Sequence, residues 1–353
     1  MSKKVALALS GGVDSSTAAW LLKEQGYDVV GVTMCLGIPV AEGERGKCCG
    51  PQEIEDARRV CQKLAIPHYV LDFADELDSM VIQPFVSAYL QGRTPNPCVE
   101  CNRSLKFGSL LHKVRALGFD CLATGHYARV EHTATYSLLR KPRDEKKDQT
   151  YFLYAMGKEE LRRVLFPLAE YSKAEVRKLA GWAGLPIAEK PDSQDICFIP
   201  ADGLASFLHR RRPEGFSAGD IVDRTGRVIG RHRGLPFYTV GQRGGLGISH
   251  RVPLYVLALD VPGNRLLVGE KEEVRAMGLI AEHLNLLVER PPDRATAKIR
   301  YAHRAAPCRI AWKKERAAIH FDTPQEAVTP GQSVVVYDGD LVVGGGIIRG
   351  AIS

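Results

Sequence analysis

Apolar runs of strand length alternate with helical segments in the first part of the chain. The run KVALALS (residues 4–10) is followed by a turn and by TAAWLLKEQG, whose apolar residues keep helical spacing up to Gly26. YDVVGVTMCL and HYVLDF are further apolar runs, with the helical segment DARRVCQKLAI between them. Strands that alternate with helices pair in parallel through right-handed crossovers. The sequence therefore predicts an α/β domain with a parallel sheet.

The pattern changes after about residue 200. Before that point, SLLHKVRALGF predicts a helix and DCLATGHYARV a strand. Beyond it, FSAGDIVDRTGRVIG and RHRGLPFYTVGQRGGLGIS are short runs divided by glycine, which is typical of hairpins. The runs ATAKIRYAHRAAPCRIAW, AAIHFDTP, QSVVVYDGD and LVVGGGIIR predict a small antiparallel barrel, with DTPQEAVTPGQ as a turn. We predict three domains: a catalytic domain (1–200), a small central domain (201–275) and a C-terminal β-barrel (276–353).

Composition narrows the class of protein. The chain has 353 residues, of which 45% are hydrophobic and 25% charged, as expected for a multidomain protein with packed cores. It has no apolar run long enough to span a membrane, and its start MSKKVALALSGG lacks the pattern of a signal peptide. We therefore expect a cytoplasmic protein without a membrane partner. In that compartment nine cysteines favour metal or thiol chemistry over disulfides, and the net charge of +7 suits either a polyanionic partner or an ordinary enzyme.

The turn after the first strand, SGGVDSS, has the composition of an anion site. Gly11 and Gly12 allow the backbone to approach a bound anion, and the helix that follows offers unsatisfied N–H groups. The hydroxyl groups of Ser10, Ser15 and Ser16 add donors. The turn lacks the lysine of a Walker loop and is not a dinucleotide GxGxxG. We interpret it as a nucleotide phosphate loop rather than as a plain turn.

SGGVDSS resembles the PP-loop of the ATP pyrophosphatases, which hold the pyrophosphate of ATP while AMP passes to an oxygen atom. TPNPCVECN, ATGHYAR, KDQTYFLY, DSQDICFI and TVGQRGGLGI then follow in order, and together they closely resemble the tRNA-specific 2-thiouridylases (MnmA/TrmU family). The resemblance extends to VTPGQSVVVYDGD near residue 338. It implies a PP-loop (adenine nucleotide alpha hydrolase-like) domain, a small middle domain and a C-terminal antiparallel β-barrel. It also implies a tRNA uridine 2-sulfurtransferase that adenylates the C2 oxygen of the wobble uridine (position 34) and replaces that oxygen with sulfur.

The resemblance assigns roles by position. The implied ATP-binding residues are Ala8, Leu9, Ser10, Gly11, Gly12, Val13, Asp14, Ser15, Met34 and Gly125. Asp14 is also the expected catalytic residue, because it would help hold Mg²⁺ against the leaving pyrophosphate. The implied tRNA contacts are Asn96, Pro97, Cys98, His126, Lys147, Asp148, Gln149, Arg300, Tyr301 and Gln332. The alternatives are a packed histidine at His126 and a solvated charged face at 147–149.

The cysteines of TPNPCVECN raise the question of how sulfur is supplied. Cys101 matches the family's catalytic cysteine, and Cys197 matches the cysteine that carries a persulfide. Cys98, however, stands where the better-known members have aspartate. Three thiolates favour a [4Fe–4S] cluster on Cys98, Cys101 and Cys197, with one iron open to hydrosulfide. A persulfide relay, a structural zinc site and inert thiols remain as alternatives, and the sulfur donor is either sulfide or a cysteine desulfurase relay.

The remaining cysteines are interpreted as structural. Cys48 and Cys49 lie in a glycine-flanked loop, where a structural pair is favoured over metal ligands. The others fall in strand or helix patterns and are expected to be small core residues: Cys35, Cys61, Cys121 and Cys308.

Two rival functions stay open at this point. One is a PP-loop ligase that adenylates a small carboxylate or amide, and the other is a metal-bearing RNA-binding module without turnover. Cleavage of ATP to AMP and pyrophosphate that depends on tRNA would separate both from the thiolase.

Overall fold

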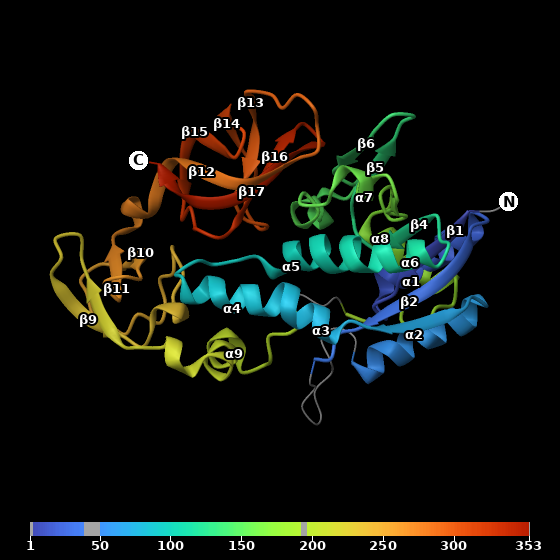
Figure 1. The fold of residues 1–353 in the computed structure, drawn as a ribbon, viewed down its shortest axis with the longest axis horizontal. Coiled ribbons are helices and arrows are strands. Elements are labelled where there is room, and N and C mark those ends of the chain that lie inside the picture. Colours follow the sequence, from blue (N-terminus) through green and yellow to red (C-terminus); the bar gives the residue numbers. More distant parts are fainter. Residues whose placement is uncertain (1–2, 39–49, 192–195, 353) are drawn as a thin grey trace. The chain divides into compact units, whose positions relative to one another are not determined.

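The computed structural model describes residues 3–38, 50–191 and 196–352 (Figure 1). The chain forms two compact units, each assembled from separate stretches of sequence. Unit 1 comprises residues 1–81, 98–198 and 340–342, and unit 2 comprises residues 82–97, 199–339 and 343–353. Within the described residues, no helix combines the length and the apolar character that a membrane span requires.

Unit 1 is built on a five-stranded sheet in which neighbouring strands pair in parallel, as the alternating pattern predicted. The strand order is β3-β2-β1-β4-β7. The strands are β1 (Lys4–Ala8), β2 (Asp28–Cys35), β3 (His68–Asp72), β4 (Cys121–Thr124) and β7 (Val164–Leu165). The helices that connect or follow them include α1 (Val13–Glu24), α2 (Pro51–Leu64) and α8 (Lys173–Trp182). Val5, Ala6 and Leu7 of β1 are fully buried, as expected for a central strand covered on both faces.

A long helical segment of unit 1 contains the cysteine motif. It consists of α5 (Pro97–Glu100), η2 (Cys101–Leu110) and α6 (Leu111–Ala116). The middle part is wound as a π-helix, a form that is rare and often found at functional sites. The helix predicted from SLLHKVRALGF is confirmed, but helical structure begins about ten residues earlier, at the cysteines. A similar succession precedes it: α3 (Ala74–Leu77), η1 (Asp78–Ile82) and α4 (Gln83–Leu90).

The strand predicted over DCLATGHYARV is wrong in its second half. β4 ends at Thr124, and the chain then forms a hairpin of β5 (Arg129–His132) and β6 (Ser137–Arg140). The break occurs at Gly125, which packs against the backbone of Asp14 and Ser15. After the hairpin come η3 (Glu145–Lys147), η4 (Thr150–Phe152) and α7 (Lys158–Leu161).

The central part of unit 2 is a four-stranded sheet with the order β10-β11-β8-β9. Its strands are β8 (Gly219–Val222), β9 (Val228–His232), β10 (Tyr255–Asp260) and β11 (Arg265–Gly269). The short helices of the same part of the chain are α9 (Gly203–Arg211), η5 (Pro213–Gly215), η6 (Leu235–Phe237) and η7 (Lys271–Val274). The predicted hairpin in FSAGDIVDRTGRVIG is confirmed by antiparallel β8 and β9. The second predicted hairpin is wrong, because after β9 the chain runs as an irregular loop with positive φ at Gly241, Gly245 and Gly247.

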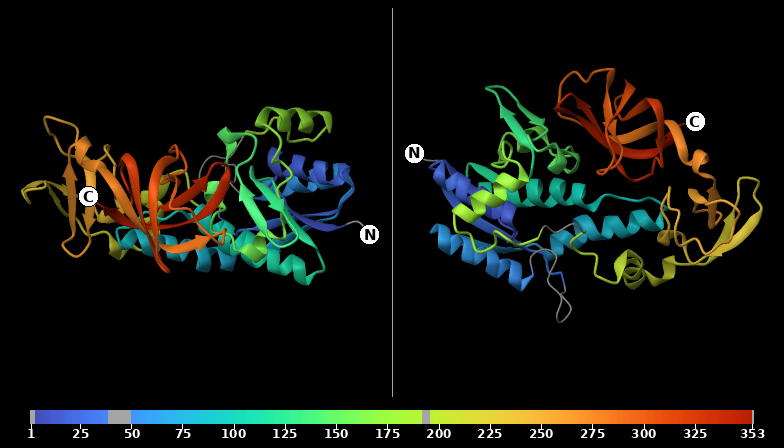
Figure 2. Two further views of the ribbon diagram at one scale, coloured as in Figure 1. Left: turned by 90° about the horizontal axis from the view of Figure 1, so that it is seen from above. Right: turned by 180° about the vertical axis from the view of Figure 1, so that it is seen from behind.

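The last part of the chain forms a closed antiparallel barrel. Its order is β12-β15-β14-β13-β16-β17, and β17 pairs back onto β12. The strands are β12 (Arg275–Leu286), β13 (Arg294–Lys298), β14 (Ala306–Trp312), β15 (Arg316–Glu326), β16 (Ser333–Asp338) and β17 (Leu341–Ile352) (Figures 1 and 2). Leu279, Ile319, Val336 and Val343 belong to its apolar core. The predicted turn DTPQEAVTPGQ is shorter than expected, because β15 continues to Glu326.

Candidate active site

The loop between β1 and α1 offers backbone N–H groups to an anion. Gly12 is the N-cap of α1, and no side chain there caps the helix. The Ser15 and Ser16 hydroxyls donate to the Gly12 carbonyl at 3.2 and 2.8 Å, and Ser10 Oγ lies 3.3 Å from Ser15 Oγ. Gly11 has φ of +67°, and a Cβ atom there would lie 2.4 Å from the Glu53 carbonyl oxygen. The serines thus hold the turn, the N–H groups stay available to a ligand, and position 11 excludes any side chain.

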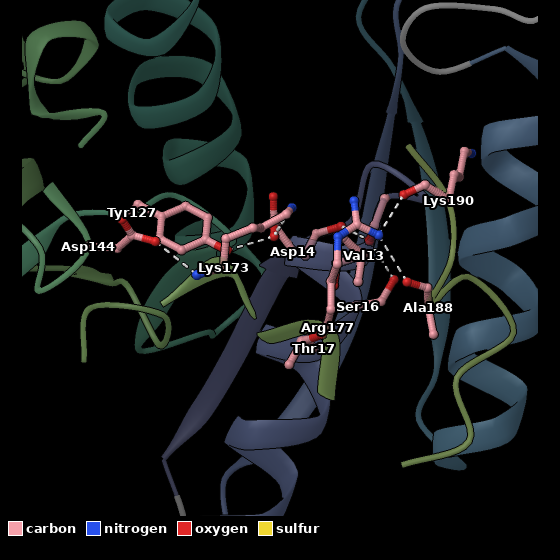
Figure 3. Close-up of polar contacts among 12 residues, drawn as sticks. Val13, Asp14, Ser16, Thr17, Tyr127, Asp144, Lys173, Arg177, Ala188 and Lys190 are labelled. Atoms are coloured by element: carbon pink, nitrogen blue, oxygen red, sulfur yellow. Dashed lines mark hydrogen bonds and ion pairs between the residues drawn. The ribbon is translucent and has the colours of Figure 1, made fainter. Parts of the chain in front are cut away.

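Asp14, in the first turn of α1, has two partners that the sequence reasoning missed. The Lys173 Nζ ammonium lies 2.7 Å from Asp14 Oδ1, and the Tyr127 hydroxyl donates to the same oxygen at 2.9 Å (Figure 3). Lys173 is the first residue of α8, after the Ser172 capping box with Glu175. The capping-box pattern SKAE was therefore the available signal for the position of Lys173 at a helix start. The side chain of Lys173 is only 12% exposed and places a cation beside the phosphate loop.

Lys190 is a second missed lysine at the loop. Its ammonium donates to the Gly11 carbonyl at 3.2 Å and to Asp56 Oδ2 at 2.7 Å, and Glu53 Oε1 lies 3.7 Å away. Burial acts to raise the pKa of Asp56, but the hydrogen bonds and positive charge of Lys190, with a further bond from Gln52, outweigh it and lower that pKa. Lys190 therefore ties α2 to the phosphate loop. No motif signalled this lysine.

Arg177 of α8 holds the segment that carries Lys190. Its guanidinium donates to the carbonyls of Ala188 and Lys190 at 3.1 and 3.2 Å (Figure 3). The backbone before Cys197 is thus fixed at residues 188–190.

The other implied ATP residues lie at the carboxyl ends of neighbouring strands. Ala8 ends β1, Met34 lies near the end of β2 and is buried, and Gly125 follows β4. A Cβ atom on Gly125 would lie 2.6 Å from the Ser15 nitrogen, so this glycine lies directly against the loop. Leu9 and Val13 are buried beside these residues in the core of the domain. This edge of a parallel α/β sheet is where such folds bind ligands.

Cys98 and Cys101 lie one helical turn apart at the start of the segment formed by α5, η2 and α6, which we call the cysteine helix. Cys98 belongs to α5 and Cys101 begins η2; both are half-buried, as is Cys197. Residues three apart share one side of a helix. Among the described residues, no group of three or more His, Cys, Asp or Glu side chains is arranged to hold a metal ion. Cys48 and Cys49 lie outside the described residues.

The remaining cysteines divide by burial. Cys61 and Cys308 are buried, which raises the pKa of each thiol to about 12 and confirms them as core residues. Cys35 and Cys121 are half-buried, and burial also raises the pKa of Cys121.

His126 packs between aromatic rings. Its ring centroid lies 6.0 Å from that of Phe107 and 6.1 Å from that of Phe166, and Nδ1 lies 2.6 Å from Thr124 Oγ1. Burial lowers the pKa of His126 well below its usual value, and the charge of Lys106 adds to the effect. The imidazole is therefore neutral near pH 7 and half-buried.

The KDQ triplet is largely internal. Asp148 is buried, and its Oδ1 accepts bonds from the Thr150 N–H at 2.9 Å and hydroxyl at 2.6 Å. Gln149 Oε1 accepts from the Tyr127 N–H at 2.9 Å, and Lys147 is half-buried. The interpretation of this triplet as a solvated charged face is therefore wrong. Asp148 and Gln149 shape the loop next to the residues that hold Asp14.

Among the implied tRNA contacts of unit 2, Gln332 bonds to the segment that leads to the cysteines. Gln332 Nε2 donates to the Thr94 carbonyl at 2.8 Å, and the Thr94 N–H donates to the Pro330 carbonyl at 2.8 Å. Arg300 donates to the Ala327 carbonyl and, at 2.6 Å, to Thr329 Oγ1. Asn96 is half-buried and Pro97 is buried, whereas the ring of Tyr301 is 39% exposed, with Lys298 Nζ 5.2 Å from its centroid.

Comparisons with known families cover nearly the whole chain. Residues 3–201 match a family described as tRNA methyl transferase HUP domain. Residues 205–270 match the tRNA methyl transferase PRC-barrel domain, and residues 276–348 match the aminomethyltransferase beta-barrel domain. The first match alone spans more than half of the chain.

Curated relatives are similar over almost their full lengths. The tRNA-specific 2-thiouridylase MnmA 1 of Syntrophus aciditrophicus is 53% identical over 352 residues, which cover 100% of this chain and 94% of the relative. The tRNA-specific 2-thiouridylases MnmA of Moorella thermoacetica and Heliobacterium modesticaldum are each 49% identical, over 97% and 99% of this chain and 98% and 93% of the relatives. Among solved structures, an NMN synthetase from Francisella tularensis covers 61% of this chain and 87% of its own, at 15% identity and a TM-score of 0.34, which is too low to carry an argument. The order of motifs, the parallel sheet with its phosphate loop and these full-length likenesses lead to one conclusion: the chain belongs to the tRNA-specific 2-thiouridylase (MnmA) family.

Proposed function

We propose that this protein is an ATP-dependent tRNA uridine 2-sulfurtransferase that acts on the wobble uridine. The observation that carries the proposal is the pairing, within unit 1, of a phosphate-binding loop flanked by Asp14 and Lys173 with a helix that begins at Cys98 and Cys101. The loop serves adenylation and the cysteines serve sulfur transfer. The names of the relatives, 2-thiouridylases, support the same reaction.

In the adenylation step, the C2 oxygen of uridine attacks the α-phosphorus of ATP and pyrophosphate leaves. The N–H groups at the start of α1 bind the leaving pyrophosphate, and Lys173 offsets its charge from the adjacent helix. The base then carries AMP on O2, which makes C2 open to a sulfur nucleophile. Attack by sulfur at C2 expels AMP and completes the exchange.

Mg²⁺ fits the donors present at the loop. Mg²⁺ in nucleotide sites is held by one or two carboxylates together with substrate phosphates and water. Asp14 supplies such a carboxylate in the first turn of α1, with 32% of its side chain exposed. Its Oδ1 already accepts from Lys173 and Tyr127. Asp14 would therefore hold Mg²⁺ together with the substrate phosphates, and the ion would neutralise those phosphates during transfer.

One sulfur route uses two cysteines. A persulfide on Cys197 attacks C2 and expels AMP, so that a disulfide links Cys197 to the sulfur on the base. The Cys101 thiolate then attacks the Cys197 sulfur, which releases 2-thiouridine and leaves a Cys101–Cys197 disulfide for a thiol reductant. Each step exchanges one bond for another and balances in electrons. The persulfide comes from a cysteine desulfurase relay.

The other route is a [4Fe–4S] cluster on Cys98, Cys101 and Cys197, supplied with sulfide. Three thiolates are the right donors for such a cluster, and two of them lie one helical turn apart. The described residues do not gather three ligands around one point, so the fit is incomplete and we derive no step through a cluster. The third thiol at Cys98 is the observation that keeps this route in the proposal.

The function is tested with purified protein, ATP, Mg²⁺, unmodified tRNA and a sulfur source, either sulfide or a desulfurase with cysteine. We expect AMP, pyrophosphate and 2-thiouridine in the digested tRNA, in equal amounts. The family descriptions mention methyl transfer, so the digest is also searched for methylated uridine. Formation of AMP without tRNA would instead favour a small-molecule ligase, and tRNA binding without AMP would favour a binding module.

A further inference from the structure

Positive charge is concentrated in the central part of unit 2. No aspartate or glutamate occurs between Asp223 and Asp260, whereas that stretch contains six arginines: Arg224, Arg227, Arg231, Arg233, Arg243 and Arg251. Arg224 pairs with Glu273 at 3.0 Å, Arg231 pairs with Asp220 at 3.3 Å, and Arg233 lies over the Phe237 ring. The guanidinium groups of the other three form no ion pair with any described residue.

Two of these three, Arg243 and Arg251, lie in one loop, Thr239–Arg251, which we call the arginine loop. Both arginines are exposed, as are Gly244, Gly245 and Gly247. His250 is exposed as well, and the loop contains no acidic residue. The loop therefore presents cationic side chains and bare backbone to solvent.

Contacts on the inner side of the loop fix its shape. Leu246 is buried in the core of the central sheet, and Ile248 packs so closely on Gly230 of β9 that a Cβ atom there would lie 2.4 Å from it. Gln242 Oε1 accepts from the Thr239 N–H at 3.1 Å, and Gln242 Nε2 donates to the Gly244 carbonyl at 2.9 Å. A loop held in this way loses little conformational entropy when it binds a ligand.

Positive φ explains why Gly245 and Gly247 are glycines, but it does not explain Gly244. Gly245 and Gly247 have φ of +74° and +68°, a region that favours glycine. Gly244 has no positive φ, and a Cβ atom there would meet nothing within 4 Å. Neither backbone conformation nor packing requires glycine at position 244. Its backbone is accessible to a ligand at this point of the surface.

The start of the loop touches the residues that lead to the cysteine helix. Thr94 Oγ1 donates to Thr239 Oγ1 at 3.4 Å, and Arg300 donates to the Val240 carbonyl at 3.4 Å. All of these residues belong to unit 2. The arginine loop is thus continuous with Arg300 and with the Thr94–Pro97 segment, where the resemblance places tRNA contacts.

We propose that the arginine loop is an RNA-binding surface of this protein that holds tRNA phosphates through Arg243, Arg251 and the exposed backbone N–H groups. The inference rests on the proposed function, because the RNA is the tRNA substrate. Protein interfaces are centred on buried apolar and aromatic anchors, and the exposed side of this loop offers no aromatic residue. Exposed guanidinium groups beside open glycine backbone match phosphate oxygens instead, without reading sequence.

The first test compares two variants of the full chain in tRNA binding at several salt concentrations. Arg243→Ala with Arg251→Ala should weaken tRNA binding on the order of tenfold and reduce the slope of log K against log[salt] by roughly one unit per lost contact. The matched control is Arg210→Ala, an exposed arginine of the same region that pairs with Asp202. The control should leave both affinity and slope within about twofold, since surface ion pairs contribute little. Equal effects of the two variants would overturn the proposal.

The second test uses Gly244, where substitution strains nothing. Gly244→Glu should weaken tRNA binding several-fold and Gly244→Lys should strengthen it, whereas Gly244→Ala reports the effect of the side chain alone. Melting temperatures should be unchanged in all three variants. Equal binding by the Glu and Lys variants would overturn the proposal.

The two proposals fail in different ways. If the unaltered protein does not bind tRNA, the proposed function fails. If it binds tRNA and the arginine-loop variants bind equally well, only the assignment of this loop fails. Normal tRNA binding combined with lost turnover from a desulfurase relay, but not from sulfide, would assign the loop to an acidic sulfur-donor protein instead.

Discussion

Asp14 is held by a lysine and a tyrosine, and this arrangement allows a specific prediction. Asp14→Asn leaves the Lys173 ammonium without its counter-charge and removes the carboxylate from the phosphate loop. We expect Asp14→Asn and Ser10→Ala to lower the rate of tRNA-dependent AMP formation by about 10²–10³. Affinity for tRNA should stay within a few-fold.

The control for this experiment is Asp28→Asn, an exposed aspartate at the start of β2. It should leave AMP formation unchanged. If Asp14→Asn weakened tRNA binding as strongly as it slowed adenylation, the loop would face RNA rather than phosphate.

His126 gives the stability of the protein a pH dependence. Its pKa is lowered in the folded chain, mainly because burial disfavours the charged ring, so the unfolded chain binds the proton more tightly. The contribution of neutral His126 to the free energy of unfolding is therefore complete above the ordinary pKa of histidine, about 6.5, and decreases as the pH drops below that value. His126→Gln should flatten the dependence of melting temperature on pH between about 5 and 7. The exposed His250→Gln serves as the control and should not.

The residues of the site differ in how far sequence could predict them. The glycines and serines of SGGVDSS were predictable, because a strand, a turn and a helix start occur together within a few residues. Lys173 and Lys190 were not, since each meets the loop only through tertiary packing, 159 and 179 residues away from its partner. The internal bonds of Asp148 and Gln149 were not predictable for the same reason. Asp148 and Gln149 bond to backbone groups that no periodicity could place.

The cysteine helix is the element on which the two sulfur routes disagree. A relay through Cys197 needs thiolates at Cys101 and Cys197 and tolerates a carboxylate at Cys98, whereas a cluster needs all three thiolates. If the cluster route operates, anaerobically prepared Cys98→Asp should lose iron, acid-labile sulfide and thiolation together, while ATP and tRNA binding persist. Iron and sulfide analysis, an absorption spectrum and a thiouridine assay measure the outcome.

The control is Cys98→Ser, which removes the thiolate without adding a carboxylate and so separates the effect of the new charge from the effect of losing a ligand. Cys35→Asp would not serve, because Cys35 is the last residue of β2. Near-normal thiolation by Cys98→Asp in air, with no iron bound, would assign the chemistry to the persulfide relay.

Regular elements followed from sequence more closely than irregular ones. β1, α1 and β2 match the apolar runs and helical spacing, because a covered parallel strand must be almost wholly apolar. β3 matches its run too, although it is an edge strand on which Tyr69 and Val70 are exposed. The break of β4 at Gly125 was not predictable, because its cause is the close approach of Asp14 and Ser15 from another element. The sequence of the arginine loop predicts a hairpin because short apolar runs divided by glycine occur both in hairpins and in irregular loops. The positive φ angles at its spaced glycines, which distinguish the loop, cannot be seen in the sequence.

At the scale of the whole molecule, the barrel should supply affinity rather than chemistry. A chain that ends after residue 275 should bind tRNA more weakly and still bind an ATP analogue. The truncation also removes Asp340, which pairs with Arg129 and Arg140 in unit 1, but these are partly exposed pairs of small energetic value. Filter binding and analogue titration test the prediction, and undiminished tRNA binding would contradict it.

Arg300→Ala is the corresponding point change. We expect weaker tRNA binding with a reduced salt dependence, as for the loss of one phosphate contact. Because the guanidinium also bonds the Ala327 carbonyl and Thr329, the melting temperature should fall as well. Arg300→Lys should recover part of the affinity; if it recovers stability alone, the role of Arg300 is confined to the barrel.

The discontinuous make-up of unit 2 has a consequence for the order of events during synthesis. Thr94, just before the cysteine helix, is anchored by Pro330 and by Gln332, and Gln332 is made 238 residues later. A ribosome that adds about 5–20 residues per second needs roughly 10–50 s to synthesise the chain between Thr94 and Gln332. During this interval a growing chain already contains Cys98 and Cys101 but not the residues that anchor the segment before them. A chain that stalls within the barrel would keep both thiols in that state.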